Sequence, residues 1–162
     1  FNFQYNTNYK CLMPCNIYGP NDNYDPLSSH FFPALISKVH LANKMNKKYI
    51  SIWGTGSPKR ELMYVDDLAN ACIFFLRKKT KETLLNVGTG KEMSILQYAK
   101  FIINEINPDI KVKFIKPHLN GVPRKIINSN KAKKYGWKPI TSLKKGFAKT
   151  YESFQKENDT NK

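Results

Sequence analysis

The stretch "YKCLMPCNIYGP", from Tyr9 to Pro20, carries the strongest indication of the fold. Most of its first ten residues are apolar, and they run directly into a Gly-Pro turn. Such a run predicts a strand buried on both faces in a parallel sheet. A buried strand needs neighbours, yet only eight residues precede this one. We therefore expect Tyr9 to Tyr18 to form a central parallel strand whose partners are absent from this chain, with exposed edges that favour aggregation.

The rest of the chain alternates between short strands and helices, which is typical of an α/β fold. Strands are expected at 49–53, in "LLNVGTG" (84–90) and in "IKVKFIK" (110–116). Helices are expected at about 30–44, 68–79, 94–107, 130–135 and 142–156, and "NGVPRK" (120–125) is expected to be a loop. Ser28 or Ser29 is the expected cap of the first helix, and Asp66 or Asp67 that of the second.

Length and composition indicate a folded domain or part of one. The chain has 162 residues, of which 41% are hydrophobic and 13% aromatic, enough for one ordinary core. No apolar run approaches the roughly 20 residues of a membrane span, and the first residues lack the features of a signal peptide. We expect a cytoplasmic protein with no membrane partner. The cysteines, Cys11, Cys15 and Cys72, have no paired spacing, which argues against disulfides and against a metal site.

The formal net charge of +15 raises the hypothesis of a nucleic-acid-binding module. However, the 24 lysines are spread over the whole chain, and only three arginines accompany them. Arginine is the better bidentate partner for phosphates and guanine edges. The charge is therefore interpreted as a solvated surface, and no nucleic-acid partner is expected.

Three motifs, in this order along the chain, are more specific. They are "MPCNIYGPNDNYDPLSSHFFPAL", "WGTGSPKRELMYVDD", and "LNVGTG" followed by "NGVPRK". Together they resemble the C-terminal half of the GDP-L-fucose synthases. These are NADPH-dependent GDP-4-keto-6-deoxy-D-mannose 3,5-epimerase/4-reductases of the extended short-chain dehydrogenase/reductase superfamily. The resemblance runs from about Phe1 to Phe154.

This resemblance implies the C-terminal part of a Rossmann-type parallel sheet plus a smaller α/β substrate-binding domain. It also implies NADP(H) as cofactor, a GDP-sugar as substrate and a homodimer at full length. The family's glycine-rich turn and its Tyr-x-x-x-Lys pair have no counterpart before Tyr9. Residues 1–162 are therefore expected to be a fragment, mainly the substrate-binding region, that lacks the N-terminal cofactor-binding half and is inactive by itself.

By the same resemblance, His30 in "SSHFFPAL" matches the family's catalytic acid and also contacts the cofactor. The reaction moves protons at C3 and C5, next to the C4 ketone, and a histidine that titrates near neutrality suits proton delivery. His40 and His118 match no family position and are assigned no catalytic role.

The family's catalytic base is a cysteine that belongs to the missing half, so Cys15 is not that base. Pro14, Cys15, Asn16 and Ile17 match the segment that contacts the nicotinamide end of the cofactor, largely through the backbone. For Cys15, packing in the core is an equal alternative.

Four positions are implied to bind the nucleotide sugar. Arg60 matches the contact to the diphosphate, where its planar guanidinium makes two parallel bonds; the alternative is a surface ion pair with Glu61 or an aspartate. Trp53 covers the sugar or base, or else is an ordinary core residue. Lys38 meets phosphate as a point charge or is simply solvated. Asn120 contacts ribose or guanine at a position where relatives have aspartate.

Two other hypotheses remain open at this point. The first is another nucleotide-sugar epimerase, dehydratase or reductase of the same superfamily, including a synthase of GDP-colitose. The second is a non-catalytic basic binding domain.

Overall fold

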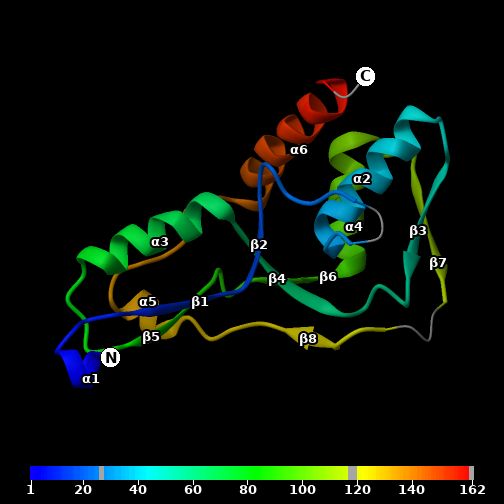
Figure 1. Ribbon diagram of the computed structural model, residues 1–162. Coiled ribbons are helices and arrows are strands. Elements are labelled where there is room, and N and C mark those ends of the chain that lie inside the picture. The colour runs from blue at the N-terminus through cyan, green and yellow to red at the C-terminus, as the bar shows by residue number, and fades with distance from the viewer. Residues whose placement is uncertain (26–27, 117–119, 161–162) are drawn as a thin grey trace. The chain divides into compact units, whose positions relative to one another are not determined.

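The structure, a computed structural model, describes residues 1–25, 28–116 and 120–160. The chain divides into two compact units, each assembled from segments that are distant in sequence (Figure 1). The first unit contains Phe1–Gly19, Glu61–Lys91 and Ile126–Thr150, and the second contains Pro20–Arg60, Glu92–Lys125 and Tyr151–Lys162.

The first unit is built on two parallel strand pairs. β1 (Cys11–Pro14) pairs with β5 (Leu84–Val87), and β2 (Asn16–Tyr18) pairs with the last three residues of β4 (Lys59–Tyr64). Its helices are α1 (Asn2–Tyr5), α3 (Val65–Arg77), α5 (Asn130–Lys134) and the beginning of α6 (Leu143–Thr160). The core residues are Cys15, Met63, Ala71, Phe75, Leu85, Val87, Ala132 and Trp137.

The expected single strand from Tyr9 to Tyr18 is wrong in three respects. The segment is divided at Cys15, where the chain passes from one strand partner to another: the Cys15 N–H still donates to Val87 of β5, and the next residue begins the pairing with β4. Both parallel partners belong to this chain. Nor is the strand buried on both faces, because three of the four residues of β1 are exposed.

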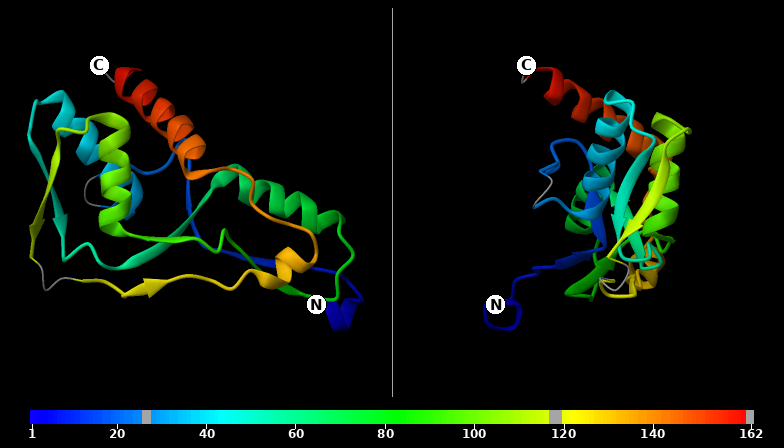
Figure 2. Two further views of the ribbon diagram at one scale, coloured as in Figure 1. Left: turned by 180° about the vertical axis from the view of Figure 1, so that it is seen from behind. Right: turned by 90° about the vertical axis from the view of Figure 1, so that its right-hand side faces the viewer.

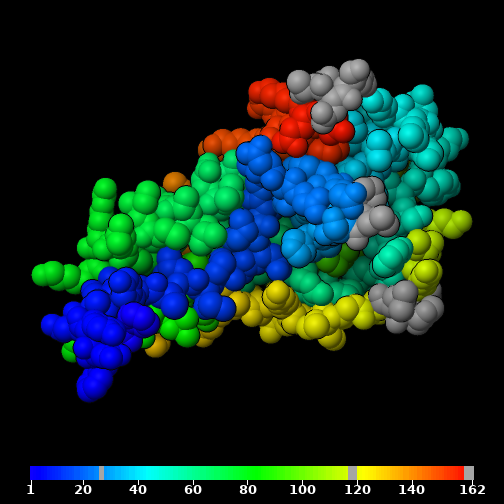
Figure 3. Space-filling model, viewed as in Figure 1, coloured from blue at the N-terminus to red at the C-terminus, as the bar shows by residue number. Residues whose placement is uncertain are grey.

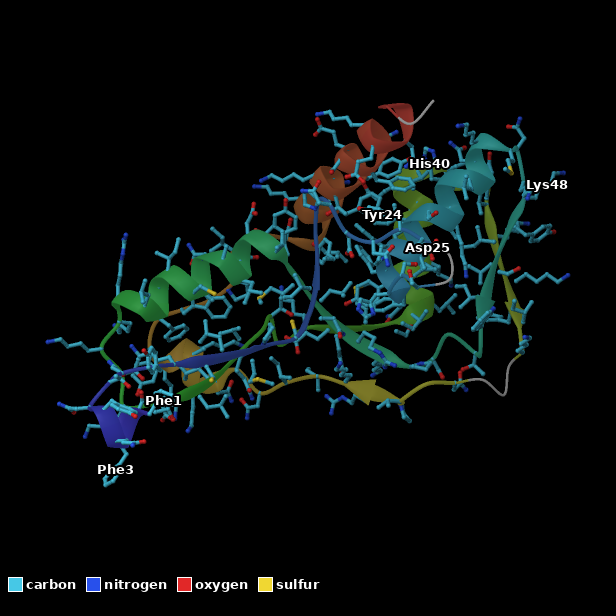
Figure 4. The ribbon with its side chains drawn as sticks, in the orientation of Figure 1. Phe1, Phe3, Tyr24, Asp25, His40 and Lys48 are labelled. Carbon is cyan, nitrogen blue, oxygen red and sulfur yellow. The ribbon has the colours of Figure 1, made fainter. Side chains whose placement is uncertain are left out.

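The N-terminal aromatic residues that precede β1 are also exposed. Phe1 is 83% accessible and Phe3 is fully accessible. Figure 4 labels both residues, and Figure 3 shows the N-terminal segment in blue at the surface. The two aromatic residues therefore add nothing to the core of this unit.

The second unit contains another parallel pair, β3 (Tyr49–Trp53) with β7 (Lys111–Ile115), seen side by side in Figures 1 and 2. The helices α2 (Phe31–Lys44) and α4 (Ile95–Ile106) pack against each other, and Phe32 of α2 meets Tyr98 of α4 edge to face. The first two residues of β4 pair with β8 (Arg124–Lys125), and β6 (Glu92–Ser94) is a further neighbour of β4.

An aromatic cluster packs the end of α6 against the rest of this unit. The rings of Tyr24 and His40 both lie against Phe154 of α6, and His40 Nδ1 is 2.9 Å from the Tyr151 hydroxyl (Figure 4). His40 is thus a structural residue of the unit, as its lack of a family match suggested. His118 lies outside the described residues.

The helix caps differ from the expected ones. The N-cap of α2 is His30, and the hydroxyl of Ser28 bonds to Asp25 and Asn23 in the preceding loop. The cap of α3 is Tyr64, because Asp67 accepts the N–H groups of two distant residues, 140 and 141, at 3.0 and 3.1 Å. The expected caps are wrong for different reasons. The Ser28 hydroxyl is bound to side chains of its own loop, whereas the Asp67 oxygens accept from residues distant in sequence.

Most other expectations are confirmed. The strands at 49–53 and 84–87, the alternating strand after Pro108 and the helices α2 to α6 are all present, with boundaries that shift by a few residues. α4 begins with a capping box formed by Ser94 and Gln97. The strand β4 was not expected, and the "NGVPRK" loop contains the two-residue strand β8. Within the described part of the chain, no helix is both long and apolar enough to cross a bilayer.

Glu61 holds three segments of the first unit together. Its side chain is fully buried in β4, where Oε1 accepts the Gly90 N–H at 2.7 Å and the Thr89 hydroxyl at 3.2 Å. Oε2 accepts the Ile127 N–H at 3.1 Å. A carboxylate in a core is costly unless such donors satisfy it. Gly88 is required beside it, since a Cβ there would collide with Glu61 Oε1.

We predict that Glu61→Gln lowers the free energy of unfolding by about 1–3 kcal/mol, because one of the amide's two atoms becomes a donor that faces other donors. Urea denaturation of the protein would measure the change. Glu152→Gln removes an exposed carboxylate that pairs only with Lys156 one turn away, and it should leave the midpoint nearly unchanged. Equal midpoints for the two variants would contradict the role of Glu61.

Candidate functional site

A cavity of about 250 Å³ lies within the second unit. Its walls come from the start of α2, the end of β3 with the turn that follows, the start of β4, the start of α4 and the segment at 120–121. The cavity brings together all four residues expected to bind the nucleotide sugar: Lys38, Trp53, Arg60 and Asn120. The other lining residues are Phe31, Ala34, Leu35, Ile52, Gly56, Pro58, Ile95 and Gly121. Two cations and no carboxylate line it, which favours an anionic ligand.

Trp53 is the last residue of β3 and is exposed over 62% of its surface. The alternative that it is a core tryptophan is therefore wrong. Trp137 has that role in the first unit, where it is 2% exposed. The Trp53 indole is an open aromatic surface at the edge of the cavity, and the Lys116 ammonium lies 5.5 Å from its centre.

Arg60 is held by backbone atoms. Its Nη1 donates to the carbonyl oxygens of Lys59 at 2.8 Å and Val122 at 2.7 Å. Among the described residues no carboxylate pairs with it, so the alternative of an ion pair with Glu61 is wrong: the Glu61 oxygens are occupied inside the first unit. Since a guanidinium has five N–H groups, those on Nε and Nη2 have no partner within the described chain and are available to a ligand.

Lys38 lies two turns into α2 and reaches the edge of the strand pair, where its ammonium donates to the Ser51 carbonyl oxygen at 3.3 Å. Burial of the ammonium lowers the pKa of Lys38 below the ordinary value for lysine. A charged ligand beside it would reverse part of that shift. The side chain as a whole is still exposed, so a solvated lysine remains the alternative for Lys38.

Asn120 is oriented by Thr55, a residue of the turn after β3. The Asn120 Oδ1 accepts both the Thr55 backbone N–H at 2.9 Å and the Thr55 hydroxyl at 3.1 Å. A backbone N–H can only donate, so the atom that faces it is the oxygen. The amide therefore offers its N–H₂ group to the cavity, as a donor. An aspartate at this position would offer an acceptor.

His30 is exposed at the N-cap of α2, immediately before the cavity residue Phe31, and does not itself line the cavity. Burial raises the pKa of Asp22, and the neighbouring His30 partly offsets that rise. The two side chains therefore interact electrostatically. The hydroxyl of the preceding residue, Ser29, is buried and has no hydrogen-bond partner within the described residues.

The segment expected to contact a cofactor lies in the first unit. Pro14 ends β1 at its carboxyl end, and Asn16 and Ile17 begin β2. The Cys15 side chain points into the core, where burial and the nearby Glu61 raise the pKa of its thiol to about 12. Packing therefore accounts for the Cys15 side chain, and a thiolate nucleophile is absent there at neutral pH.

Sequence reasoning missed two features of the cavity. The apolar wall formed by Phe31, Ile95 and their neighbours was treated only as helix, and Thr55 only as part of a glycine turn. Thr55 was in principle visible, since "GTG" places a hydroxyl between two glycines. Its pairing with a residue 65 positions away is visible only in three dimensions.

Comparison of the sequence with protein-family models identifies the family of this chain. Residues 1–88, more than half of the chain, match the model of the NAD dependent epimerase/dehydratase family. The chain belongs to this family.

Two curated relatives of this epimerase/dehydratase chain carry GDP-sugar names. The GDP-L-fucose synthase of Sinorhizobium fredii is 39% identical over 151 residues, which are 93% of this chain and 48% of that protein. The GDP-L-colitose synthase of Yersinia pseudotuberculosis is 34% identical over 154 residues, 93% of this chain and 50% of that protein. The chain thus spans about half the length of the curated relatives it matches.

A solved structure gives the same result for the fold. A GDP-D-glycero-L-gluco-heptose synthase from Campylobacter jejuni, determined in the presence of NADPH, superposes with a TM-score of 0.79 and 28% identity, covering 96% of this chain and 55% of that one. The expected α/β class with a Rossmann-type parallel sheet is confirmed by this likeness.

Proposed function

We propose that this chain forms the GDP-sugar-binding part of an NADPH-dependent GDP-4-keto-6-deoxy-D-mannose 3,5-epimerase/4-reductase, whose product is GDP-L-fucose. The observation that carries the proposal is the meeting of Lys38, Trp53, Arg60 and Asn120 in one cavity without a carboxylate. The relatives' names differ in the sugar and share GDP. A pocket common to them is therefore expected to bind the nucleoside diphosphate.

Each of the four side chains has a role that suits a GDP ligand. Arg60, fixed through Nη1, directs its remaining N–H groups to the diphosphate, where the geometry of the fork matters. Lys38 adds a second positive charge. The Trp53 indole packs against the sugar or the base, and the Asn120 N–H₂ group donates to a ligand oxygen or ring nitrogen. The aliphatic wall excludes water and strengthens these polar contacts.

A fucose product is supported by several GDP-L-fucose synthases at 35–41% identity. GDP-colitose is the second candidate, supported by the 34% identity to the Yersinia enzyme. Both reactions need the same nucleotide contacts. They differ at the sugar, so product analysis separates them.

His30 is proposed as the acid of the epimerisation. Abstraction of a proton beside the C4 ketone gives an enolate, and reprotonation on the opposite face inverts the carbon. A histidine at an exposed helix N-terminus can exchange its proton with solvent between turnovers. The Asp22 carboxylate interacts electrostatically with the His30 ring.

NADP(H), when bound, would supply the hydride for the C4 reduction. The segment from Pro14 to Ile17 fits a contact with it, because this segment lies at the carboxyl end of a parallel strand, where α/β folds bind ligands. Its outer residues are exposed or half-buried, whereas the Cys15 side chain is enclosed. A contact there would use the backbone, and no reaction step is assigned to the thiol.

Arg60→Lys in the complete enzyme tests the binding part of the proposal. The substitution keeps the charge and removes the fork, so the affinity for GDP should fall about tenfold, roughly 1.4 kcal/mol for one charge-assisted bond. Calorimetric titration with GDP measures it. Arg77→Lys makes the same change on the exposed last turn of α3 and serves as the control. Equal losses for the two variants would remove Arg60 from the binding site.

His30→Gln in the complete enzyme tests the catalytic part. Loss of the acid should slow solvent-deuterium incorporation at C3 or C5 by about 10²–10⁴-fold. The affinity for GDP should stay within twofold, which also shows that the variant is folded. Nuclear magnetic resonance of the product in deuterated water follows the exchange. Unchanged exchange with full conversion to the fucose configuration would eliminate His30 as the acid.

A further inference from the structure

The strands β3 and β7 end at the same level, and the residue after each strand has a left-handed backbone conformation. Trp53 lies opposite Ile115 in the parallel register. The next residues, Gly54 and Lys116, both have left-handed backbone angles, with φ of 72° and 47°. Glycine adopts this conformation freely, whereas for lysine it is unfavourable. The Gly54 N–H fixes the turn by donating to the carbonyl oxygens of Ile115 at 3.0 Å and Lys116 at 3.3 Å.

This turn determines where the Lys116 side chain lies. Its ammonium is 5.5 Å from the centre of the Trp53 ring, within the range of a cation–π contact. The indole is largely exposed and lines the cavity. The Lys116 ammonium, which lies over this indole, is therefore next to the cavity. Lys111 and Lys113, on the preceding strand β7, have no such aromatic partner in the described chain.

The charges around the cavity are unbalanced. Lys38 and Arg60 line it, and Lys116 adds a third cation at its edge. Within the described residues, none of the three forms an ion pair with a carboxylate. Like charges gathered in this way raise the local concentration of anions and favour a ligand that carries more than one negative charge.

We propose that Lys116 is a further anion-binding residue of this cavity. Its ammonium lies over Trp53 and binds a phosphate group of a nucleoside diphosphate when that ligand enters. The inference rests on the proposed GDP-sugar function and names a contact beyond the four residues already assigned. On binding, the ammonium exchanges its contact with the ring for a charge-assisted bond to a phosphate oxygen. The Trp53 face is then free to pack against the ligand.

The test is a calorimetric titration of the complete enzyme with GDP and with guanosine at low and high salt. Lys116→Gln should lower the affinity for GDP about five- to tenfold at low salt, with a smaller difference at high salt because salt screens exposed charges. The affinity for guanosine, which has no phosphate, should not change. Lys113→Gln removes the same charge three residues earlier, on β7, and it should change the GDP affinity less than twofold.

A second variant separates charge from backbone effects. Asparagine tolerates left-handed angles, so Lys116→Asn should retain the turn and show the same loss for GDP. Equal losses for the variants at 113 and 116, or a fall in guanosine affinity equal to that for GDP, would overturn the role of Lys116. A wild-type enzyme that binds no GDP would overturn the proposed function itself. GDP binding that is unaffected by either substitution at 116 would overturn this inference alone.

Discussion

The alternation of side chains along β4 is the constraint on which the rest of the structure depends. Arg60 and Glu61 are neighbours in a strand, and neighbouring side chains of a strand point to opposite faces. Arg60 therefore reaches the cavity of the second unit, while Glu61 enters the core of the first. The buried carboxylate, bound by three donors, fixes this register. A slip by one residue would bury the guanidinium and expose the carboxylate.

The cavity depends on a second feature, the shared end of two parallel strands. β3 supplies Trp53 and the turn with Thr55, and the chain that follows β7 supplies Lys116 and Asn120. Residues more than 60 positions apart thus meet where both strands stop. Three cations lie at this end, and none of them pairs with a carboxylate of the described residues. The electrostatic preference for an anion therefore comes from the fold as well as from any single residue.

Much of the fold could be predicted from the sequence, and the failures have a common physical cause. β3, β5, α4 and α5 follow local patterns of apolar spacing and glycine, and they lie where expected. β4 escaped prediction because its first three residues, Lys59, Arg60 and Glu61, are all charged. Only the donors from residues 89, 90 and 127 make a buried glutamate there acceptable. The cap expected at Asp67 failed similarly, because its oxygens accept from residues distant in sequence.

In the candidate site, too, some features could be predicted from the sequence and others could not. A resemblance to a family was sufficient to choose Lys38, Trp53, Arg60 and Asn120, and the structure brings them together. Neither the direction of the Asn120 amide nor the position of Lys116 over Trp53 follows from a pattern, because both depend on backbone angles and contacts across the unit.

The central claim is that the cavity of the second unit binds the nucleoside diphosphate of a GDP-sugar. A crystal structure of the complete enzyme with GDP tests it most directly. The account predicts diphosphate oxygens within hydrogen-bonding distance of the Arg60 Nε or Nη2 atoms, with the nucleotide enclosed by Trp53 and Asn120. GDP bound elsewhere on the protein, with this cavity empty and Arg60 bonded only to backbone carbonyl oxygens, would contradict it.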